Sequence, residues 1–208
     1  MGIYSERIFP WMLDRSTDRG VFHKRRARVV GPASGDVLEI GFGTGATLPF
    51  YDAGKVRSLT VVEPSVGMNK KAAKRIAGSN LDVRSEPLAG EDLPFSDESF
   101  DCVVCCLTLC SVEDPATVLA EVHRVLRPGG SFRYFEHVAS EEPGWRRWQD
   151  RLNPVQRVVG VGCNLNRPTR ELIAESGLAI DDSRLEIEHK LPLAGLFPFA
   201  EGVARKTP

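Results

Sequence analysis

The chain has 208 residues and a net charge of −1, from 27 basic and 28 acidic side chains. This balance argues against nucleic-acid binding, which usually requires a basic excess. Hydrophobic residues make up 42% and charged residues 26% of the chain, proportions typical of a globular protein. No apolar run approaches the ~20 residues of a membrane span. The segment Met1–Asp14 contains acidic residues and no long apolar stretch, so we expect neither a transmembrane segment nor a signal peptide.

The cysteines favour a reducing environment. Five is an odd number, and three of them crowd into the segment Cys102–Cys106. A disulfide framework is therefore not expected, and a cytoplasmic location is. Cys102 and Cys105 lie in a predicted strand, where an offset of three residues points them to opposite faces. We expect buried thiols there and no metal site.

The first 30 residues are expected to form a helical cap, with a short basic helix over Val21–Val30. We expect its run His23–Arg28 to be a solvated helix face, with attraction to an anionic acceptor or to a membrane surface as a weaker alternative. Residues 36–138 then alternate short apolar runs with helical stretches. The apolar runs, which predict strands buried on both faces, are Val37–Ile40, Leu59–Glu63, Leu81–Ser85, Asp101–Cys106 and Ser131–Phe135.

The helical stretches complete a repeating pattern. One helix is expected from its N-cap Ser65 to about Ala77, and another over Pro115–Leu126, ended by a Pro-Gly-Gly turn. Residues 140–178 indicate an insertion of helices and loops. Leu185–Lys190 and Phe199–Arg205 indicate two antiparallel strands within residues 179–208. We predict one domain over residues 1–208, an α/β fold with a doubly wound, mostly parallel sheet and an antiparallel C-terminal strand pair.

A glycine-rich turn, Gly41-Phe42-Gly43-Thr44-Gly45, follows the first predicted strand and precedes an expected helix. Glycine is needed where the backbone takes positive φ or approaches a ligand closely. The turn lies at the carboxyl edge of the predicted sheet, where open α/β folds bind their ligands. A tight turn without a ligand is the alternative, and three alternating glycines argue against it.

An acidic residue, Glu63, ends the second predicted strand. A carboxylate at that position can accept hydrogen bonds from both hydroxyls of a ribose. The alternative is a surface carboxylate that caps the helix after Ser65. Together with the glycine-rich turn, Glu63 predicts a cofactor that contains adenosine.

Two cofactor classes fit these residues. The turn satisfies the loose G-x-G-x-x-G/A pattern with Ala46 in the sixth place, so an NAD(P)-dependent oxidoreductase is the alternative. Glu39 argues against it, because a carboxylate deep in a parallel strand needs partners and suits a ligand with cationic groups. A third hypothesis is an adenosine-binding domain without catalysis.

Further segments extend the pattern. VLEIGFGTG, VVEPS, the loop from Leu88 to Asp101 and RVLRPGG together resemble the class I S-adenosylmethionine-dependent methyltransferases over about Asp36–Val138. The resemblance implies that residues 36–138 form the cofactor-binding core and that residues 140–178 face the methyl acceptor. It implies S-adenosylmethionine as the cofactor, S-adenosylhomocysteine as its product, and no metal.

The resemblance also assigns parts of the cofactor to residues. The glycine-rich turn would cradle the methionine part, Glu63 would bind the ribose, and the loop before Leu93 would contact adenine. This chain has Ala89-Gly90 where the family often has Asp-Ala, so backbone amides of Gly90 and Glu91 would replace the usual side-chain contact. The implied cofactor-binding residues are Glu39, Gly41, Phe42, Gly43, Thr44, Gly45, Glu63, Pro64, Met68, Gly90, Glu91, Cys105 and Cys106.

A narrower resemblance concerns the acceptor. CLTLCSVEDPATVLAEVHRVLRPGG, the segment Glu136–Ala139 and GCNLNR look like the methyltransferase-like family whose animal members methylate alkyl thiols. Similar sequences include quinone- and phospholipid-type methyltransferases. The resemblance implies methyl transfer to a small-molecule acceptor through thiol, oxygen or amine, with a lipid or a quinol among the alternatives.

Several residues are candidates for acting on that acceptor. His137 follows the fifth predicted strand and is the first candidate for a general base, with Glu136 to orient it. Each has a structural alternative, a backbone contact for His137 and an ion pair for Glu136. The candidate acceptor-binding residues are Trp145, Trp148, Asn164 and Arg167, whose alternatives are core packing, turn chemistry and a solvated charge.

Overall fold

The computed structural model describes residues 2–17, 20–187 and 194–207. Within them, a seven-stranded sheet has the order β3-β2-β1-β4-β5-β7-β6. The strands are β1 (Gly35–Ile40), β2 (Val56–Val62), β3 (Val83–Glu86), β4 (Phe100–Cys106), β5 (Leu126–His137), β6 (Ala179–Ile187) and β7 (Pro198–Arg205). The helical elements are η1 (Tyr4–Ile8), α1 (Phe9–Thr17), α2 (Val21–Val30), η2 (Leu48–Phe50), α3 (Val66–Ala77), α4 (Pro115–Val125), α5 (Pro143–Val159), α6 (Thr169–Glu175) and η3 (Ala194–Leu196).

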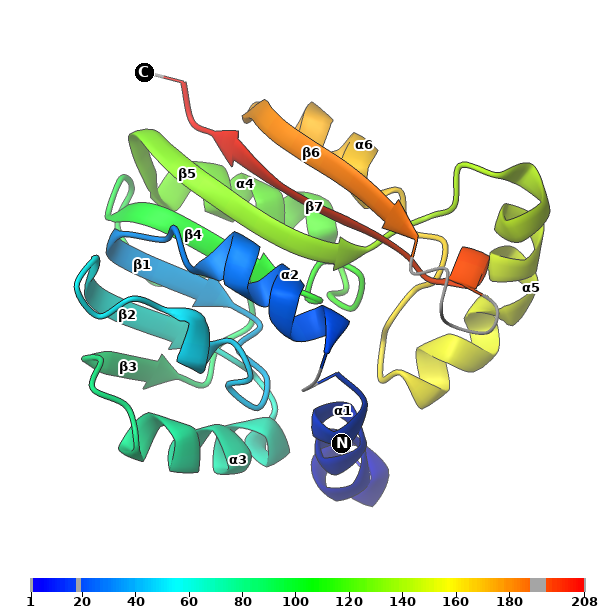
Figure 1. The fold of residues 1–208 in the computed structure, drawn as a ribbon, viewed down its shortest axis with the longest axis horizontal. Helices are drawn as coiled ribbons and strands as arrows, with labels where there is room; N and C mark the ends of the chain where they lie inside the picture. Colours follow the sequence, from blue (N-terminus) through cyan, green and yellow to red (C-terminus); the bar gives the residue numbers. More distant parts are fainter. Residues whose placement is uncertain (1, 18–19, 188–193, 208) are drawn as a thin grey trace.

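Strands β1 to β5 run parallel, and β7 lies antiparallel between β5 and β6. Helix α2 lies over one face of the sheet, and α4 and α6 lie over the other (Figure 1). The five parallel strands end at one edge, beyond which α1 and α5 lie (Figure 1). The predicted doubly wound, mostly parallel sheet with an antiparallel C-terminal strand pair is confirmed.

The apolar runs are buried because each strand of the sheet centre is covered on both faces. Leu38 and Cys105 belong to the hydrophobic cluster on one face, and Val37 and Cys102 belong to the cluster on the other. The side chains alternate along each strand, as the period of two requires. The expectation that Cys102 and Cys105 point to opposite faces is confirmed.

The structure corrects three expected elements. The strand expected at 131–135 begins at Leu126, because Leu126 already pairs with Phe100 of β4. The glycine-rich turn leads into the single 3₁₀ turn η2, which contains Pro49, and an α-helix does not follow it. The strand expected at 185–190 begins at Ala179, and residues 188–190 lie outside the described residues. Its first half is polar because β6 is the edge strand, which needs no continuous apolar run.

The expectation of a solvated basic face on α2 is wrong for Arg25 and Arg26, whereas Lys24 and Arg28 are exposed as expected. Arg25 and Arg26 are only 2% and 5% exposed. The Arg25 guanidinium lies 3.8 Å from the carboxylate of Glu201 on β7. It also lies over the rings of Phe135 and Phe199, at 5.6 Å and 5.4 Å from their centroids. Arg25 therefore packs onto the sheet against a buried carboxylate and two aromatic faces, and Arg26 donates to the Thr17 carbonyl oxygen at 2.7 Å.

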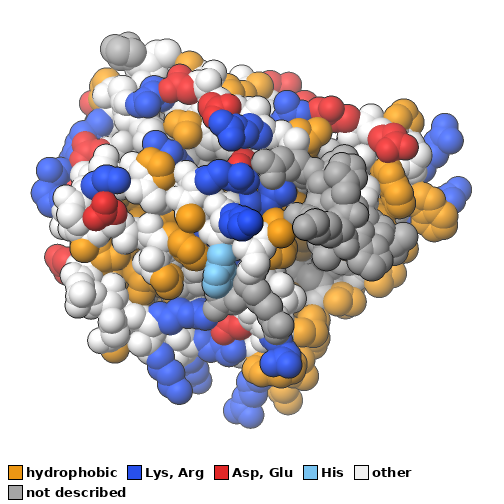
Figure 2. All heavy atoms as spheres, in the orientation of Figure 1, with side chains coloured by type: hydrophobic (Ala, Val, Ile, Leu, Met, Phe, Trp, Pro, Cys, Tyr) orange, Lys and Arg blue, Asp and Glu red, His pale blue; other side chains and the backbone are white. Residues whose placement is uncertain are grey.

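The N-terminal segment, η1 and α1, turns acidic side chains inward and apolar ones outward. Glu6 accepts a hydrogen bond from the backbone N–H of Gly67 in α3, at 2.5 Å. Asp14 accepts from Lys71 Nζ at 3.1 Å, also on α3. Trp11, by contrast, is 57% exposed. Figure 2 shows hydrophobic and basic side chains side by side at the lower edge of the molecule, where α1 lies. Hydrogen bonds and ion pairs of Glu6 and Asp14 with α3 therefore hold this segment against the body of the protein, together with the buried Pro10.

The described helices differ from membrane spans. The longest, α5, has 17 residues and carries several arginines. No helix within residues 2–17, 20–187 and 194–207 is both long and apolar enough to cross a bilayer. In the same ranges, no group of three or more His, Cys, Asp and Glu side chains is arranged to hold a metal ion.

Candidate functional site

The glycine-rich turn after β1 is closely packed at its ends and open in its middle. Gly41, Gly43 and Gly45 all have positive φ, at +74°, +59° and +78°. A side chain at Gly41 would collide with Thr108, and one at Gly45 would lie 3.1 Å from the Phe42 ring. At Gly43, the only heavy atom within 4 Å of a built Cβ is the Gly41 carbonyl oxygen, at 3.9 Å. The middle of the turn can therefore receive a ligand close to its backbone.

Glu63, directly after β2, braces this turn. Its Oε2 accepts a hydrogen bond from the Gly43 backbone N–H at 2.8 Å, and its Oε1 accepts one from the Ser65 N–H at 2.9 Å. Burial raises the pKa of the Glu63 carboxyl, and the two backbone donors oppose the rise. A carboxylate has about four acceptor positions, so two remain for the hydroxyls of a ribose.

Glu39 lies beneath the turn and is fully buried. Its Oε2 accepts hydrogen bonds from Tyr51 Oη at 2.7 Å and Thr47 Oγ1 at 3.0 Å, whereas its Oε1 has no hydrogen-bond partner. Burial raises the pKa of this carboxyl to about 7. Buried polar atoms are normally satisfied, so the orphaned Oε1 fits a site that a polar ligand or its bound water completes.

The loop expected to contact adenine lies against β1. A side chain at Gly90 would place its Cβ 2.6 Å from Cγ2 of Ile40, so only glycine allows this approach. The Glu91 side chain points away to the start of α4, where its Oε1 accepts from the backbone N–H of Glu113 at 3.1 Å. The Gly90 backbone therefore lies directly against β1, without a side chain between them.

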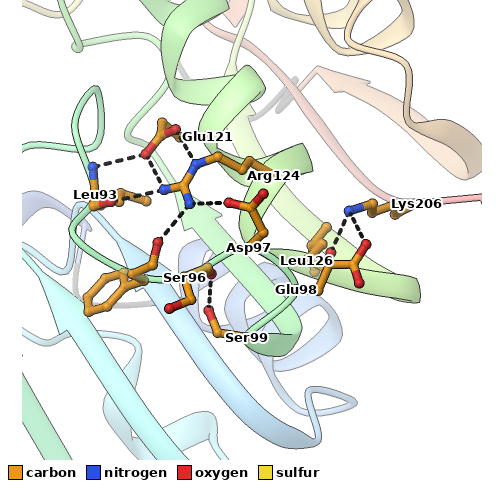
Figure 3. Close-up of polar contacts among 10 residues, drawn as sticks. Leu93, Ser96, Asp97, Glu98, Ser99, Glu121, Arg124, Leu126 and Lys206 are labelled. Carbon is orange, nitrogen blue, oxygen red and sulfur yellow. Dashed lines mark hydrogen bonds and ion pairs between the residues drawn. The ribbon is translucent and has the colours of Figure 1, made fainter.

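Arg124 of α4 fixes the next part of the same loop (Figure 3). Its guanidinium donates to the carbonyl oxygens of Phe95 at 2.7 Å and Leu93 at 2.9 Å. It also pairs with the carboxylates of Asp97 at 2.8 Å and Glu121 at 2.7 Å. Three of these partners lie in the loop and Glu121 lies on α4, so Arg124 ties the loop to the helix.

Glu136, the expected partner of a general base, instead binds the loop after β4. Its carboxylate is fully buried and accepts from the backbone N–H groups of Thr108 at 2.9 Å and Cys110 at 3.2 Å. Burial raises its pKa to about 7, and the backbone donors oppose the rise. Thr108 Oγ1 in turn donates to the Ile40 carbonyl oxygen at 3.0 Å. Glu136 thus links β5, the loop after β4 and the start of the glycine-rich turn.

Asn164 and Arg167, expected to bind the acceptor, contact the same loop. Asn164 Nδ2 lies 3.2 Å from the carbonyl oxygen of Cys110. Arg167 Nη1 donates to the carbonyl oxygens of Leu109 at 2.6 Å and Val112 at 2.7 Å. The structure therefore brings Glu136, Asn164 and Arg167 together around residues 108–112, with each side chain bound to backbone.

His137 has partners on both ring nitrogens. It is 3% exposed, and its Nε2 lies 3.2 Å from the carbonyl oxygen of Leu196. Because a carbonyl oxygen only accepts, Nε2 must carry a proton. Its Nδ1 lies 3.7 Å from Cys163 Sγ. The imidazole thus meets a cysteine of the insertion, a contact that the sequence pattern did not indicate.

The two tryptophans do not form one wall. Trp145 packs on Gly195, where an added Cβ would collide with its indole ring. Trp148 is 51% exposed and stacks with the guanidinium of Arg151 at 5.6 Å. Their three-residue spacing shares a helix face, but only Trp145 lies against another element.

The remaining predicted cofactor residues take different positions. Phe42 and Cys105 lie in the hydrophobic clusters, and Met68 is buried in α3. Cys106 is half-buried and Pro64 is exposed.

Sequence reasoning missed the contacts of the N-terminal segment with this site. Asp14 hydrogen-bonds the Thr44 hydroxyl, and Arg75 Nη1 donates to the Thr44 carbonyl oxygen at 2.7 Å. One signal was present, because Lys71 and Arg75 are four residues apart and form a basic stripe on α3. Nothing local connects that stripe with an aspartate 57 residues earlier in the chain.

Comparisons with known proteins agree with this geometry. A family model described as a methyltransferase domain matches residues 38–134. Human thiol S-methyltransferase TMT1A is 35% identical over 207 residues, which cover 91% of this chain and 82% of the relative. Human thiol S-methyltransferase TMT1B is 42% identical over 144 residues, 66% of this chain, and the match spans only 58% of TMT1B. A solved geranyl diphosphate methyltransferase in complex with SAM has the same fold, with a TM-score of 0.70, 19% identity and coverage of 88% and 84%.

The doubly wound sheet, the open glycine-rich turn and the acidic residue after β2 are the features expected of a fold that binds an adenosine-containing cofactor at the carboxyl edge. The family model and the relatives narrow this class to methyl transfer. The chain belongs to the S-adenosylmethionine-dependent methyltransferase family. An NAD(P)-dependent oxidoreductase is not favoured.

Replacing Glu63 by alanine should weaken the binding of S-adenosylhomocysteine by about 1–3 kcal/mol, because charge-assisted hydrogen bonds to the ribose and the brace on Gly43 are both lost. Titration calorimetry measures the affinity. Glu86, at the end of the neighbouring strand β3, is the matched control, and Glu86→Ala should bind like the wild type. Equal affinity of Glu63→Ala and the wild type would show that the ribose lies elsewhere.

Proposed function

We propose that this enzyme methylates the sulfur of small-molecule thiols. The observation that supports the proposal is the 35% identity with TMT1A over 91% of this chain, which reaches well beyond the methyltransferase core at residues 38–134. The acceptor side of the enzyme, which the core alone does not supply, is therefore part of the similarity.

The residues present fit S-adenosylmethionine. Gly43 offers an open backbone, Glu63 offers two acceptor positions, and Glu39 offers an orphaned oxygen beneath the turn. Gly90 keeps the next loop close to β1. When bound, the cofactor supplies a methyl group that its sulfonium sulfur has already activated. The protein then has to hold the cofactor, orient the acceptor against it and exclude water.

A thiol acceptor requires little base catalysis. A free thiol has a pKa of ≈ 8.5, so a modest thiolate fraction is present at neutral pH. In our proposal Glu136, Asn164 and Arg167 are positioning residues, which fix residues 108–112 beside the glycine-rich turn. Orientation of the acceptor against the methyl donor can account for up to ~7–11 kcal/mol of barrier lowering.

The test is transfer of a labelled methyl group from S-adenosylmethionine to a panel of one alkyl thiol, one quinol, one amine and phosphatidylethanolamine vesicles. We expect product from the thiol, and none from it in the Glu63→Ala variant at cofactor concentrations that leave that variant unloaded. Methylation of the quinol or the phospholipid without methylation of the thiol would assign a different acceptor. Cofactor binding without product from any of them would refute thiol methylation.

A further inference from the structure

Two cysteines and a histidine from separate parts of the chain meet at the carboxyl edge of the sheet. Cys110 follows β4, Cys163 lies between α5 and α6, and His137 ends β5. The Sγ atoms of Cys110 and Cys163 are 3.8 Å apart, and Cys163 Sγ is 3.7 Å from His137 Nδ1. All five cysteines of the chain are free thiols.

The surroundings distinguish the two thiols. Cys110 is 2% exposed, whereas Cys163 is only partly buried. Leu196 fixes the proton of His137 on Nε2, which leaves Nδ1 and Cys163 to share one further proton. If that proton lies on Nδ1, an imidazolium faces a thiolate. A nearby imidazolium is a known way of activating a cysteine.

The titration of the pair agrees with this geometry. The hydrogen bond between the two thiols, the largest cause, lowers the pKa of Cys163, and the contact with His137 lowers it further. The same hydrogen bond, together with burial, raises the pKa of Cys110. Both pKa directions and the contact with His137 therefore favour Cys163 over Cys110 as the attacking sulfur.

We propose that Cys163 and Cys110 form a thiol–disulfide exchange site for small disulfides, in which Cys163 attacks and Cys110 resolves. The proposal is independent of methyl transfer. In the first step the Cys163 thiolate attacks one sulfur of R–S–S–R. The S–S bond of the ligand breaks, a mixed disulfide forms on Cys163, and R–S⁻ leaves and takes up a proton.

In the second step Cys110 loses its proton and attacks the Cys163 sulfur, and the second R–S⁻ leaves and takes up that proton. The two protein thiols are oxidised by two electrons, and the small disulfide is reduced to two thiols. For this bond to form, the two sulfurs must approach from 3.8 Å to about 2.05 Å. The new bond would join the loop after β4 to the segment between α5 and α6.

The experiment treats the reduced full chain with oxidised glutathione at pH 6.5 and maps the peptides by mass spectrometry without reduction. We expect a cross-linked peptide pair that contains Cys110 and Cys163 and has lost two hydrogens. The Cys110→Ser variant should stop at the mixed glutathione disulfide on Cys163. The Cys163→Ser variant should leave Cys110 reduced, and the matched control Cys102→Ala should still form the cross-link.

A second measurement requires no variant of the pair. Alkylation of the wild type by limiting iodoacetamide at pH 6.5 should label Cys163 at least tenfold faster than Cys102, Cys105 or Cys106. The His137→Gln variant, which keeps a donor for Leu196, should reduce the rate at Cys163 about tenfold. Labelling of Cys163 no faster than the strand cysteines would overturn the role of attacking thiol. A persistent mixed disulfide on wild-type Cys163, with Cys110 still reduced, would overturn the role of Cys110.

Discussion

Replacing Glu201 by alanine should lower the free energy of unfolding by about 3–5 kcal/mol, the cost of breaking a buried ion pair. Glu201 lies on β7, between β5 and the edge strand β6, and is 4% exposed. Its carboxylate lies 3.8 Å from Arg25 and 2.7 Å from Arg28. Arg25 is 2% exposed, so the substitution leaves its charge between α2 and the sheet without the Glu201 counter-charge. Denaturant unfolding measures the change.

A matched control lies on the adjacent strand. Asp182 pairs with Arg184 at 3.5 Å, and both side chains are more than half exposed. The Asp182→Ala variant should change the free energy of unfolding by less than about 1 kcal/mol, because exposed pairs contribute little. If Glu201→Ala were no more destabilising than Asp182→Ala, the contact between α2 and the sheet would not depend on this charge.

For α2, the sequence predicts the position of the helix but not the burial of its arginines. Its length and boundaries follow from local pattern, since the helix was expected over Val21–Val30 and is found there. Its burial does not, because the counter-charge for Arg25 lies 176 residues further along the chain and no periodicity connects them. A run of basic residues normally indicates a solvent-exposed helix face. Arg25 is buried because it lies over the aromatic rings of Phe135 and Phe199, which only the folded chain brings next to it.

The candidate site also has features that the sequence predicts and features that it does not. Backbone features such as the turn at Gly43 and the acid at the end of β2 were predictable, because strand order places them together at one edge. Side-chain roles on the acceptor side were not. Arg167 and Glu136 have the residue types of acid–base chemistry, yet their partners are carbonyl and amide groups of one loop. Residue type cannot tell a group that binds a ligand from one that binds backbone.

Stability should fall as the pH rises from about 5 to 8, because two fully buried carboxyls titrate in this range. The pKa values of Glu39 and Glu136 are about 7 in the folded protein, whereas an unperturbed glutamate carboxyl has a pKa of 4.5. Between these values the native state binds more protons than the unfolded state, so the free energy of unfolding decreases with pH. The stabilisation is fully present below the unfolded pKa and is lost as the pH passes through about 7. Each carboxyl contributes roughly 2 kcal/mol between pH 5.5 and 8.

The double variant Glu39→Gln/Glu136→Gln should remove most of this slope. Each glutamine keeps a carbonyl oxygen, which can accept from Tyr51 in place of Glu39 and from the Thr108 N–H in place of Glu136, but neither titrates. Denaturant unfolding at a series of pH values between 5.5 and 8 compares the variant with the wild type. Asp52→Asn is the control, because Asp52 is an exposed carboxyl whose pKa the Gly54 backbone N–H lowers, and its titration ends well below this range. A wild-type stability that stays constant or rises from pH 5.5 to 8 would show that the two buried carboxyls are already ionised in the folded enzyme.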